Sequence, residues 1–264
     1  MSLVRVAGRQ GVFCRAFQEE LSGAAGRAFC RIIFVEQPLL KVSNLFVELE
    51  QHRILEDISF EVGRGETLAV VGPNGAGKTV LFRTLLGLIP YKGKIEWIPG
   101  VKIGYVPQRF SIEPDLPLTV AEFLKLKGGS PKEIETEISS VGFGKEILNQ
   151  QIGVLSSGQQ QRVLIAWALV GNPDILLFDE PTSGIDIAAG ETIYHFLHKL
   201  QVGRKLTILL ISHDLQVVFQ HATKVICLDR EQICFGPPKQ ALDATTLARL
   251  FGVELEHHHC EHHD

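Results

Sequence analysis

The sequence contains no apolar run long enough to cross a bilayer. Its longest apolar stretches, such as Val163–Val170, fall far short of the roughly 20 residues that a membrane-spanning helix needs. An apolar segment typical of a secretory signal is also missing from the first thirty residues. The 264 residues, of which 45% are hydrophobic, suffice for one large core or two closely joined subdomains. We therefore expect a soluble protein, which could still bind a membrane protein.

An excess of positive charge is likewise absent, and so is any C-x-x-C pair of cysteines. The net charge of −4 gives no broad attraction to nucleic acid or to anionic lipid, and we expect no nucleic-acid partner. The cysteines are odd in number and scattered, which favours a reducing cytosol. They are Cys14, Cys30, Cys227, Cys234 and Cys260.

Three regions differ in composition. Residues 1–38 are rich in arginine and small residues, and we expect a poorly ordered extension or a misplaced start codon rather than an organelle transit sequence. Residues 39–250 carry the regular apolar patterns of a folded domain. Residues 251–264 form a tail that is rich in histidine.

Apolar strands alternate with helical patterns through the folded region. A helical insert is predicted at about 110–160, between two groups of strands. This alternation indicates an α/β fold with a mostly parallel sheet and helices on both faces. Strands are predicted at residues 39–49, 54–62, 67–71, 102–106, 174–179, 206–211, 224–228 and 232–235.

Residues Gly72–Thr79 read GPNGAGKT and fit the phosphate-binding pattern G-x-x-x-x-G-K-[ST]. They follow an apolar strand and precede a helical pattern, which is the context that makes this motif specific. Backbone N–H groups of such a loop meet phosphate oxygens, the lysine reaches the β- and γ-phosphates, and the threonine holds Mg²⁺. A glycine-rich turn alone would not explain the Lys-Thr pair. The predicted nucleotide-binding residues are Gly72, Pro73, Asn74, Gly75, Ala76, Gly77, Lys78, Thr79 and Val80.

Two adjacent carboxylates follow a second apolar strand, Ile175–Phe178. An acid at the end of such a strand lies at the carboxyl edge of the sheet, beside the glycine loop. Asp179 is therefore predicted to bind Mg²⁺, and Glu180 to orient or deprotonate the attacking water. Without the glycine loop, two solvated acids at a strand end would be the simpler interpretation.

His213 and Gln108 also follow predicted strands at this edge. His213 could hydrogen-bond the γ-phosphate and stabilise developing charge, and Gln108 could bind the metal ion or the water. By themselves, both would be ordinary loop residues. The predicted catalytic residues are Glu180, His213, Lys78 and Gln108, and the predicted Mg²⁺ ligands are Thr79, Gln108 and Asp179.

The segment Leu155–Arg162 reads LSSGQQQR and resembles the signature L-S-G-G-Q-x-Q-R of ABC-transporter ATPases. The order of glycine loop, Gln108, signature, Asp179-Glu180, Ser183–Asp186 and His213 is similar to that family over about residues 39–240. The resemblance implies a P-loop NTPase core with an N-terminal antiparallel β subdomain and an inserted helical subdomain.

The resemblance also implies the cofactors, the partners and the location. Two subunits would pair head to tail, so that each ATP with its Mg²⁺ meets the partner's Ser156, Gly158 and Gln159, while Asp186 links the two sites. Completion of a site by a second subunit resembles the logic of an arginine finger. Integral-membrane permease subunits would bind the pair at the cytoplasmic face of the inner membrane.

Several segments are most similar to the ATPases of zinc-uptake ABC importers, with manganese importers as close relatives. These are Ile103–Gln108, Leu116–Val120, Val225–Arg230 and Phe235–Pro238. A periplasmic or extracellular metal-binding protein would then be an indirect partner. The tail could bind Zn²⁺, because histidine and cysteine are its preferred ligands, although an expression tag is an alternative. Its candidate ligands are His257, His258, His259, Cys260, His262 and His263.

Four residues depart from the family pattern. Ser157 replaces a signature glycine, Val80 replaces a hydroxyl residue, and Trp167 stands where arginine is usual. Leu49 stands where an aromatic residue normally stacks on adenine, and Phe46 or His52 could substitute only with altered spacing. These departures predict weak base selectivity and a modest turnover.

Three other functions compete with this interpretation. A DNA-repair ABC enzyme needs a long coiled-coil arm and a basic face, but only 49 residues separate Pro107 from Ser157. A regulator without catalysis would tolerate the loss of Lys78 or Glu180, yet both are present. An ABC transporter ATPase for another substrate, such as manganese or an iron chelate, stays open because the ATPase does not touch the cargo.

Overall fold

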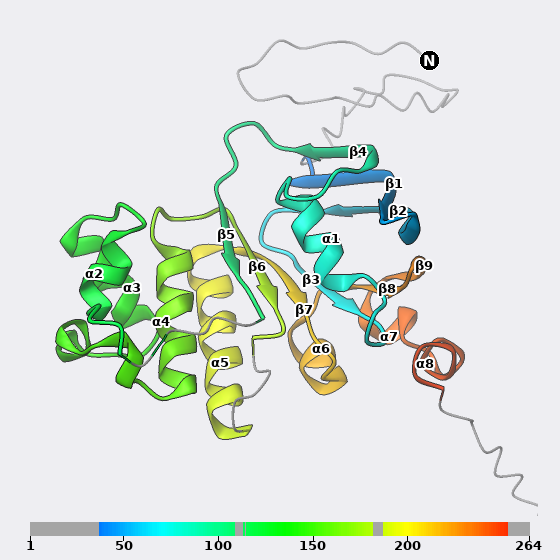
Figure 1. Cartoon of the computed structure of the whole chain (residues 1–264). Coiled ribbons are helices and arrows are strands. Elements are labelled where there is room, and N and C mark those ends of the chain that lie inside the picture. Colours follow the sequence, from blue (N-terminus) through cyan, green and yellow to red (C-terminus); the bar gives the residue numbers. More distant parts are fainter. Residues whose placement is uncertain (1–36, 109–112, 114, 182–186, 253–264) are drawn as a thin grey trace, which may run out of the picture.

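A computed structural model describes residues 37–108, 113, 115–181 and 187–252. Its strands form one nine-stranded sheet in the order β4-β1-β2-β9-β8-β3-β7-β6-β5 (Figure 1). The predicted extension 1–38 and the predicted tail 251–264 lie almost wholly outside the described residues.

One end of the sheet is antiparallel. The strands β1 and β2 form a hairpin, and β4 pairs with the free edge of β1. Their inward side chains alternate with exposed ones, as expected for strands with one solvated face. The bounds are β1 Leu40–Leu49, β2 His52–Val62 and β4 Lys92–Trp97.

The other end is parallel and buried on both faces. All five residues of β3, β6 and β7 are buried, which explains their continuous apolar sequence. A hairpin of β8 and β9 joins this part to β2. The bounds are β3 Thr67–Val71, β5 Ile103–Val106, β6 Ile175–Asp179, β7 Thr207–Ile211, β8 Lys224–Asp229 and β9 Glu231–Gly236.

Helix α1 (Lys78–Leu85) packs between the antiparallel strands and one face of the parallel sheet. Its buried Leu81, Phe82 and Leu85 share a core with residues of β1, β2, β3, β6 and β7. The first residue of α1 is therefore anchored from both parts of the sheet, directly after β3 and the glycine loop.

A group of helices stands to one side of the sheet (Figure 1). It comprises α2 (Val120–Lys125), α3 (Pro131–Ser140) and α4 (Ser157–Leu169), with 3-10 turns at Lys145–Asn149 and Ile152–Val154. Thr119, Ser130 and Ser156 cap the three helices through their hydroxyl groups. These elements occupy the stretch where the sequence predicts a helical insert, although α4 continues beyond residue 160.

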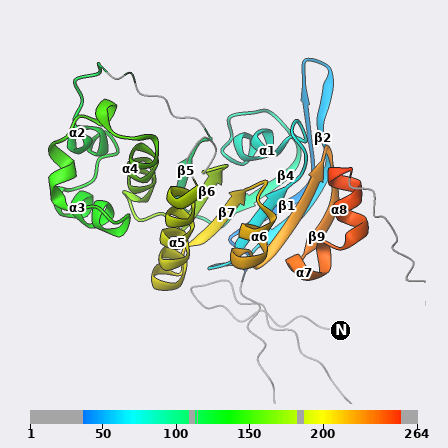
Figure 2. The same ribbon diagram turned by 90° about the horizontal axis from the view of Figure 1, so that it is seen from below.

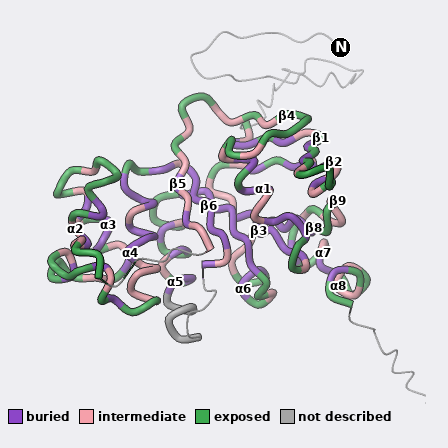
Figure 3. The backbone as a smooth tube through the Cα atoms, viewed as in Figure 1, coloured by how far each residue is buried: buried purple, intermediate pink, exposed green. Residues whose placement is uncertain are grey.

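The remaining helices cover the second face and the end of the sheet. Helices α5 (Ile187–Arg204) and α6 (Leu215–His221) lie below the parallel strands, and α7 (Pro238–Ala241) and α8 (Ala244–Phe251) lie beside β8 and β9 (Figure 2). Burial is concentrated in the central strands and on the helix faces that meet them (Figure 3). Among the described helices, none is both long and apolar enough to cross a membrane.

The structure contains elements that the sequence patterns do not predict. Strand β4 is one, because its KGKIEW sequence is largely exposed and lacks a continuous apolar face. The two terminal helices α7 and α8 are others, and α7 has only four residues. Strand β9 extends one residue beyond the predicted segment at each end.

Candidate functional site: a glycine loop and two carboxylates at one sheet edge

The glycine loop runs from β3 into α1 and is held by close backbone contacts. A Cβ on Gly72 would lie 1.9 Å from the carbonyl oxygen of Leu228, so only glycine fits there. Gly77 has φ 92°, in the left-handed region, and a Cβ on it would lie 2.7 Å from a side-chain methyl of Leu55. The loop therefore presents bare backbone at the start of a helix, as phosphate binding requires.

Lys78 is the first residue of α1 and is 6% exposed. Its Nζ donates hydrogen bonds of 2.9 Å to the carbonyl oxygens of Gly72 and Pro73, which holds the ammonium group over the loop. Burial lowers the pKa of Lys78, whereas the nearby carboxylates of Glu180 and Asp179 act in the opposite direction. A triphosphate would satisfy this buried cation directly.

Thr79 and Asp179 bring two oxygen atoms together beside the loop. The Thr79 hydroxyl donates to Asp179 Oδ1 over 3.2 Å. Burial raises the pKa of Asp179, which is 1% exposed, although the hydrogen bond from Thr79 partly offsets this. A hydroxyl and a buried carboxylate at this spacing suit Mg²⁺, which prefers hard oxygen ligands.

Glu180 lies at the meeting point of three strand ends. Gln108 follows β5, and its Nε2 donates to Glu180 Oε2 over 2.7 Å. His213 follows β7, and its Nδ1 lies 3.9 Å from the same oxygen. Glu180 itself has φ 46° and donates its backbone N–H to Ile211. Because the carboxyl ends of parallel strands meet at one edge, residues 33 to 105 positions apart in the sequence gather here.

The segment Ser156–Gln159 forms the start of α4 and faces solvent. Ser156 and Ser157 are exposed. The Ser156 hydroxyl accepts from the Gln159 N–H, and the Gln159 side chain accepts from the Ser156 N–H, which is a capping box. Among the described residues, no hydrogen bond joins this segment to the glycine loop of its own chain. The segment is therefore accessible to a second molecule.

Comparison with known proteins decides the family. The family model described as ABC transporter matches residues 55–183. The zinc import ATP-binding protein ZnuC of Cereibacter sphaeroides is 40% identical over 216 residues, which cover 81% of this chain and 88% of that protein. The chain belongs to the ABC transporter ATPases. It is therefore an enzyme that couples ATP hydrolysis to transport.

Other similar proteins support the same family assignment. The zinc import ATP-binding protein ZnuC of Pseudomonas syringae pv. syringae is 36% identical, covering 86% of this chain and 89% of that protein. A solved structure of a metal-chelate type ABC transporter in an inward-facing conformation is 26% identical, with a TM-score of 0.74 over 82% of this chain and 90% of that chain. The ATP-binding cassette MJ1267 in its ADP conformation shares the fold, with 21% identity and a TM-score of 0.72 over 83% of this chain and all of that chain.

Some predicted site residues of this ABC ATPase cannot be placed. Asp186, the predicted link between the two ATP sites, lies outside the described residues. The candidate tail ligands lie there as well; they are His257, His258, His259, Cys260, His262 and His263. These assignments stay predictions.

The structure shows the surroundings of three residues that depart from the family pattern. Ser157 is the first residue of α4 and is not among the described residues with positive φ, so its Cβ fits a helical backbone. Val80 packs against the core around α1. Trp167 stacks on Phe123 at 6.0 Å, and the ammonium of Lys127 lies 4.3 Å from its ring centre. Trp167 therefore belongs to the packing of the helical group.

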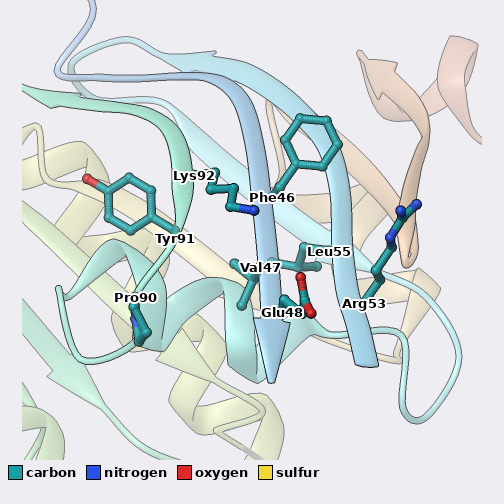
Figure 4. A pocket seen from close by; sticks show the side chains of 8 residues that line it. All are labelled: Phe46, Val47, Glu48, Arg53, Leu55, Pro90, Tyr91 and Lys92. Carbon is teal, nitrogen blue, oxygen red and sulfur yellow. The ribbon is translucent and has the colours of Figure 1, made fainter. Parts of the chain in front are cut away.

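A hollow of about 380 Å³ opens beside the β1–β2 hairpin (Figure 4). Phe46 lies on one side of it, and Pro90 and Tyr91, from the loop before β4, lie on the other. Leu55 lines the hollow and also approaches Gly77, so the hollow borders the glycine loop. Leu49 does not line it and packs against the core around α1 instead. Of the two substitutes considered for Leu49, Phe46 lines this hollow and His52 does not.

Sequence reasoning missed residues that support the glycine loop from the β8–β9 hairpin. The carbonyl of Leu228 packs on Gly72, and the Arg230 N–H donates to the Ala76 carbonyl over 3.3 Å. Tyr105 was missed too; burial raises its pKa, and the Asp179 carboxylate acts in the same direction. No motif marks these residues, because two of them act through their backbone and all depend on strand order.

Proposed function

We propose that this chain is the ATP-hydrolysing subunit of a metal-ion ABC importer and that the metal ion is zinc. The observation that carries the catalytic part is the convergence of Lys78, Asp179 and Glu180 on one glycine loop. Support for zinc comes from relatives named zinc import ATP-binding proteins, which match over most of their length. The ATPase does not touch the cargo, so the site itself carries no preference for zinc.

In this proposal, each site residue has a separate task. The loop amides and Lys78 hold the phosphates; Thr79 and Asp179 would hold Mg²⁺, which would neutralise charge on the phosphate oxygens. Glu180 orients the attacking water and accepts its proton. Gln108 fixes the Glu180 carboxylate through the 2.7 Å hydrogen bond, and His213 stabilises the charge that develops on the γ-phosphate.

The dimer is part of the proposal. Two subunits pair head to tail, so that Ser156, Gly158 and Gln159 of one copy complete the ATP site of the other. The exposure of Ser156 and Ser157 supports this arrangement. The dimer binds permease subunits at the cytoplasmic face of the cell membrane, and a periplasmic or extracellular protein delivers the metal ion. Zinc binding by the histidine-rich tail remains a separate proposal.

The role of Glu180 can be tested by Glu180→Gln. We expect this variant to bind MgATP as the parent does, to lose hydrolysis by about 100-fold or more, and to accumulate as an ATP-bound dimer. Phosphate release and size-exclusion chromatography measure these outcomes. Glu231→Gln, at an exposed position in β9, is the control and should hydrolyse normally. Turnover by Glu180→Gln at the parental rate would show that Glu180 is not the catalytic carboxylate.

The choice of zinc requires the whole transporter. The chain, its permease and the extracellular metal-binding protein are reconstituted in liposomes, and ATP-dependent uptake of zinc, manganese and an iron chelate is compared. We expect zinc to be taken up most efficiently, and Glu180→Gln to abolish its uptake. Preferential uptake of manganese or the iron chelate would retain the ATPase assignment and reject zinc.

A further inference from the structure

Two cysteines face each other across the β8–β9 hairpin. Cys227 of β8 and Cys234 of β9 are direct partners in the antiparallel register, their Cα atoms are 4.7 Å apart, and their sulfur atoms form a disulfide. A Cα separation of this size lies within the usual range for disulfides. No C-x-x-C pattern marks the pair, because the hairpin register rather than sequence spacing brings these residues together.

This cysteine pair lies directly beside the glycine loop. Cys227 is also the parallel partner of Val71 in β3, and Val71 is the residue immediately before Gly72. One residue further along β8, the Leu228 carbonyl packs on Gly72. At the hairpin turn, the Arg230 N–H is bonded to the carbonyl of Ala76. The hairpin that carries the cysteine pair thus supports both the first glycine and the middle of the loop.

The redox state of the pair changes the space that it needs. Bonded sulfur atoms lie about 2 Å apart, whereas two thiols must separate to a van der Waals contact of roughly 3.5–4 Å. Cys227 is fully buried in a core with Ala69, Val71, Val218 and Val225. Close-packed cores do not absorb such a change locally. The displacement therefore passes to β8 and its contacts with the glycine loop, or to Cys234.

We propose that Cys227 and Cys234 form a thiol–disulfide modification site that sets the affinity of the glycine loop for nucleotide. The disulfide holds the β8–β9 hairpin against the glycine loop and favours nucleotide binding. The dithiol form binds nucleotide more weakly. This inference rests on the proposed nucleotide site. The reacting partner is a low-molecular-weight thiol and its disulfide, such as glutathione.

The exchange begins at Cys234, which is only partly buried. In the oxidising direction, the Cys234 thiolate attacks glutathione disulfide, releases one glutathione thiolate and forms a mixed disulfide. Cys227 then loses its proton and attacks Cys234 Sγ, which releases the second glutathione. The protein dithiol is oxidised by two electrons, and one glutathione disulfide is reduced to two glutathione molecules.

The experiment uses the full chain equilibrated over a range of glutathione to glutathione disulfide ratios. Alkylation and mass spectrometry report the fraction of Cys227 joined to Cys234. Calorimetry with MgADP, which is not hydrolysed, reports nucleotide affinity at each ratio. We expect the pair to interconvert fully, and the reduced form to bind MgADP about fivefold more weakly than the oxidised form.

Matched variants separate the pair from other thiols. Cys234→Ser and Cys234→Ala should each abolish the redox dependence of MgADP affinity, whereas Cys260→Ser should retain it. Failure of the disulfide to form, equal affinities in both states, or a redox dependence that survives in both Cys234 variants would overturn the inference. If MgADP binds neither the oxidised nor the reduced form, the nucleotide site itself is refuted, and this inference falls with it.

Discussion

At the scale of single residues, the site depends on contacts between the glycine loop and strands distant in sequence. The motif predicts which residues meet phosphate, but it does not say why each glycine is needed. Gly72 is needed because the Leu228 carbonyl occupies the space of a side chain. A Cβ on Gly75, by contrast, would meet no described atom within 4 Å, and this glycine is needed for its φ of 82°.

Gly72→Ala should therefore destabilise the protein. Its Cβ would displace the backbone of β8, and we expect the free energy of unfolding to fall by about 3 kcal/mol or more. Gly87→Ala is the control, since Gly87 has φ 73° but open space around it among the described residues, and we expect a loss of only about 1 kcal/mol. Denaturant titration measures both. Equal losses would show that the Leu228 contact is unimportant for stability.

The preference for adenine over guanine nucleotides also depends on single residues. Leu49 is an aliphatic, partly buried residue that packs against the core around α1, so it offers no aromatic ring on which adenine could stack. We expect ATP and GTP to be hydrolysed with kcat/KM values within about threefold of each other, since hydrophobic contact alone discriminates weakly. Phosphate release with each nucleotide measures this. A preference for ATP above about tenfold would contradict the prediction and direct attention to Phe46.

At the scale of elements, an ion pair joins the helical group to helix α5, which packs on the main sheet. Arg204, the last residue of α5, donates to both carboxylate oxygens of Glu137 in α3, over 3.0 and 2.8 Å. The Glu137 side chain is 6% exposed. Burial raises the pKa of Glu137, and the arginine only partly offsets this effect. The carboxylate is therefore costly to bury unless Arg204 is present.

Arg204→Met should destabilise the protein at neutral pH. We expect the free energy of unfolding to fall by about 2 kcal/mol, less than for a fully buried pair because the Arg204 side chain is 29% exposed. Without the arginine, the pKa of Glu137 rises further above its unfolded value. The decrease in the free energy of unfolding should therefore become smaller as the pH falls below that raised pKa, because Glu137 is then protonated in the folded state.

An exposed ion pair in the same helix is the control. Lys145 pairs with Glu135 of α3 over 2.6 Å, and both side chains are well exposed. Lys145→Met should change the free energy of unfolding by less than about 1 kcal/mol at either pH. Denaturant titrations at pH 7 and pH 5 compare the two variants. An Arg204→Met loss that is the same at both pH values would rule out Glu137 as its source.

At the scale of the whole molecule, the proposed head-to-tail dimer would make each ATP site a product of two chains. Lys78→Ala should disable the glycine loop, and Ser156→Arg should disable the exposed segment at the start of α4. Each variant alone should be inactive. In a mixed dimer, the intact glycine loop of one chain meets the intact Ser156 segment of the other, so one complete site returns.

Mixing the two variants should therefore restore a substantial part of the parental ATPase activity. Circular dichroism should first show that Lys78→Ala and Ser156→Arg are folded. Mixing Lys78→Ala with Thr79→Ala is the matched control, because neither chain then supplies an intact loop, and activity should stay at background. Lack of restoration between folded Lys78→Ala and Ser156→Arg chains would contradict completion of the site by a second chain.

Local patterns were sufficient for the phosphate-binding loop, for most of the order of strands and helices along the chain, and for the assignment of Asp179 and Glu180 to a strand end. Each of these depends on neighbours in sequence. Predictions were poorer for β4, which is largely exposed, and for α7, which has only four residues; α8 was not predicted either. The pairing of Cys227 with Cys234 and the roles of Leu228 and Arg230 were not predictable in this way.

The amino-acid sequence by itself determined the family and the chemistry, because the phosphate-binding motif and the two carboxylates lie on contiguous segments whose local conformation is encoded nearby. Only the tertiary structure decided which strands flank β3, and hence which backbone supports the glycine loop. Strand order is set by the packing of the whole sheet. Contacts that depend on it, including a disulfide beside a nucleotide site, therefore leave no local pattern.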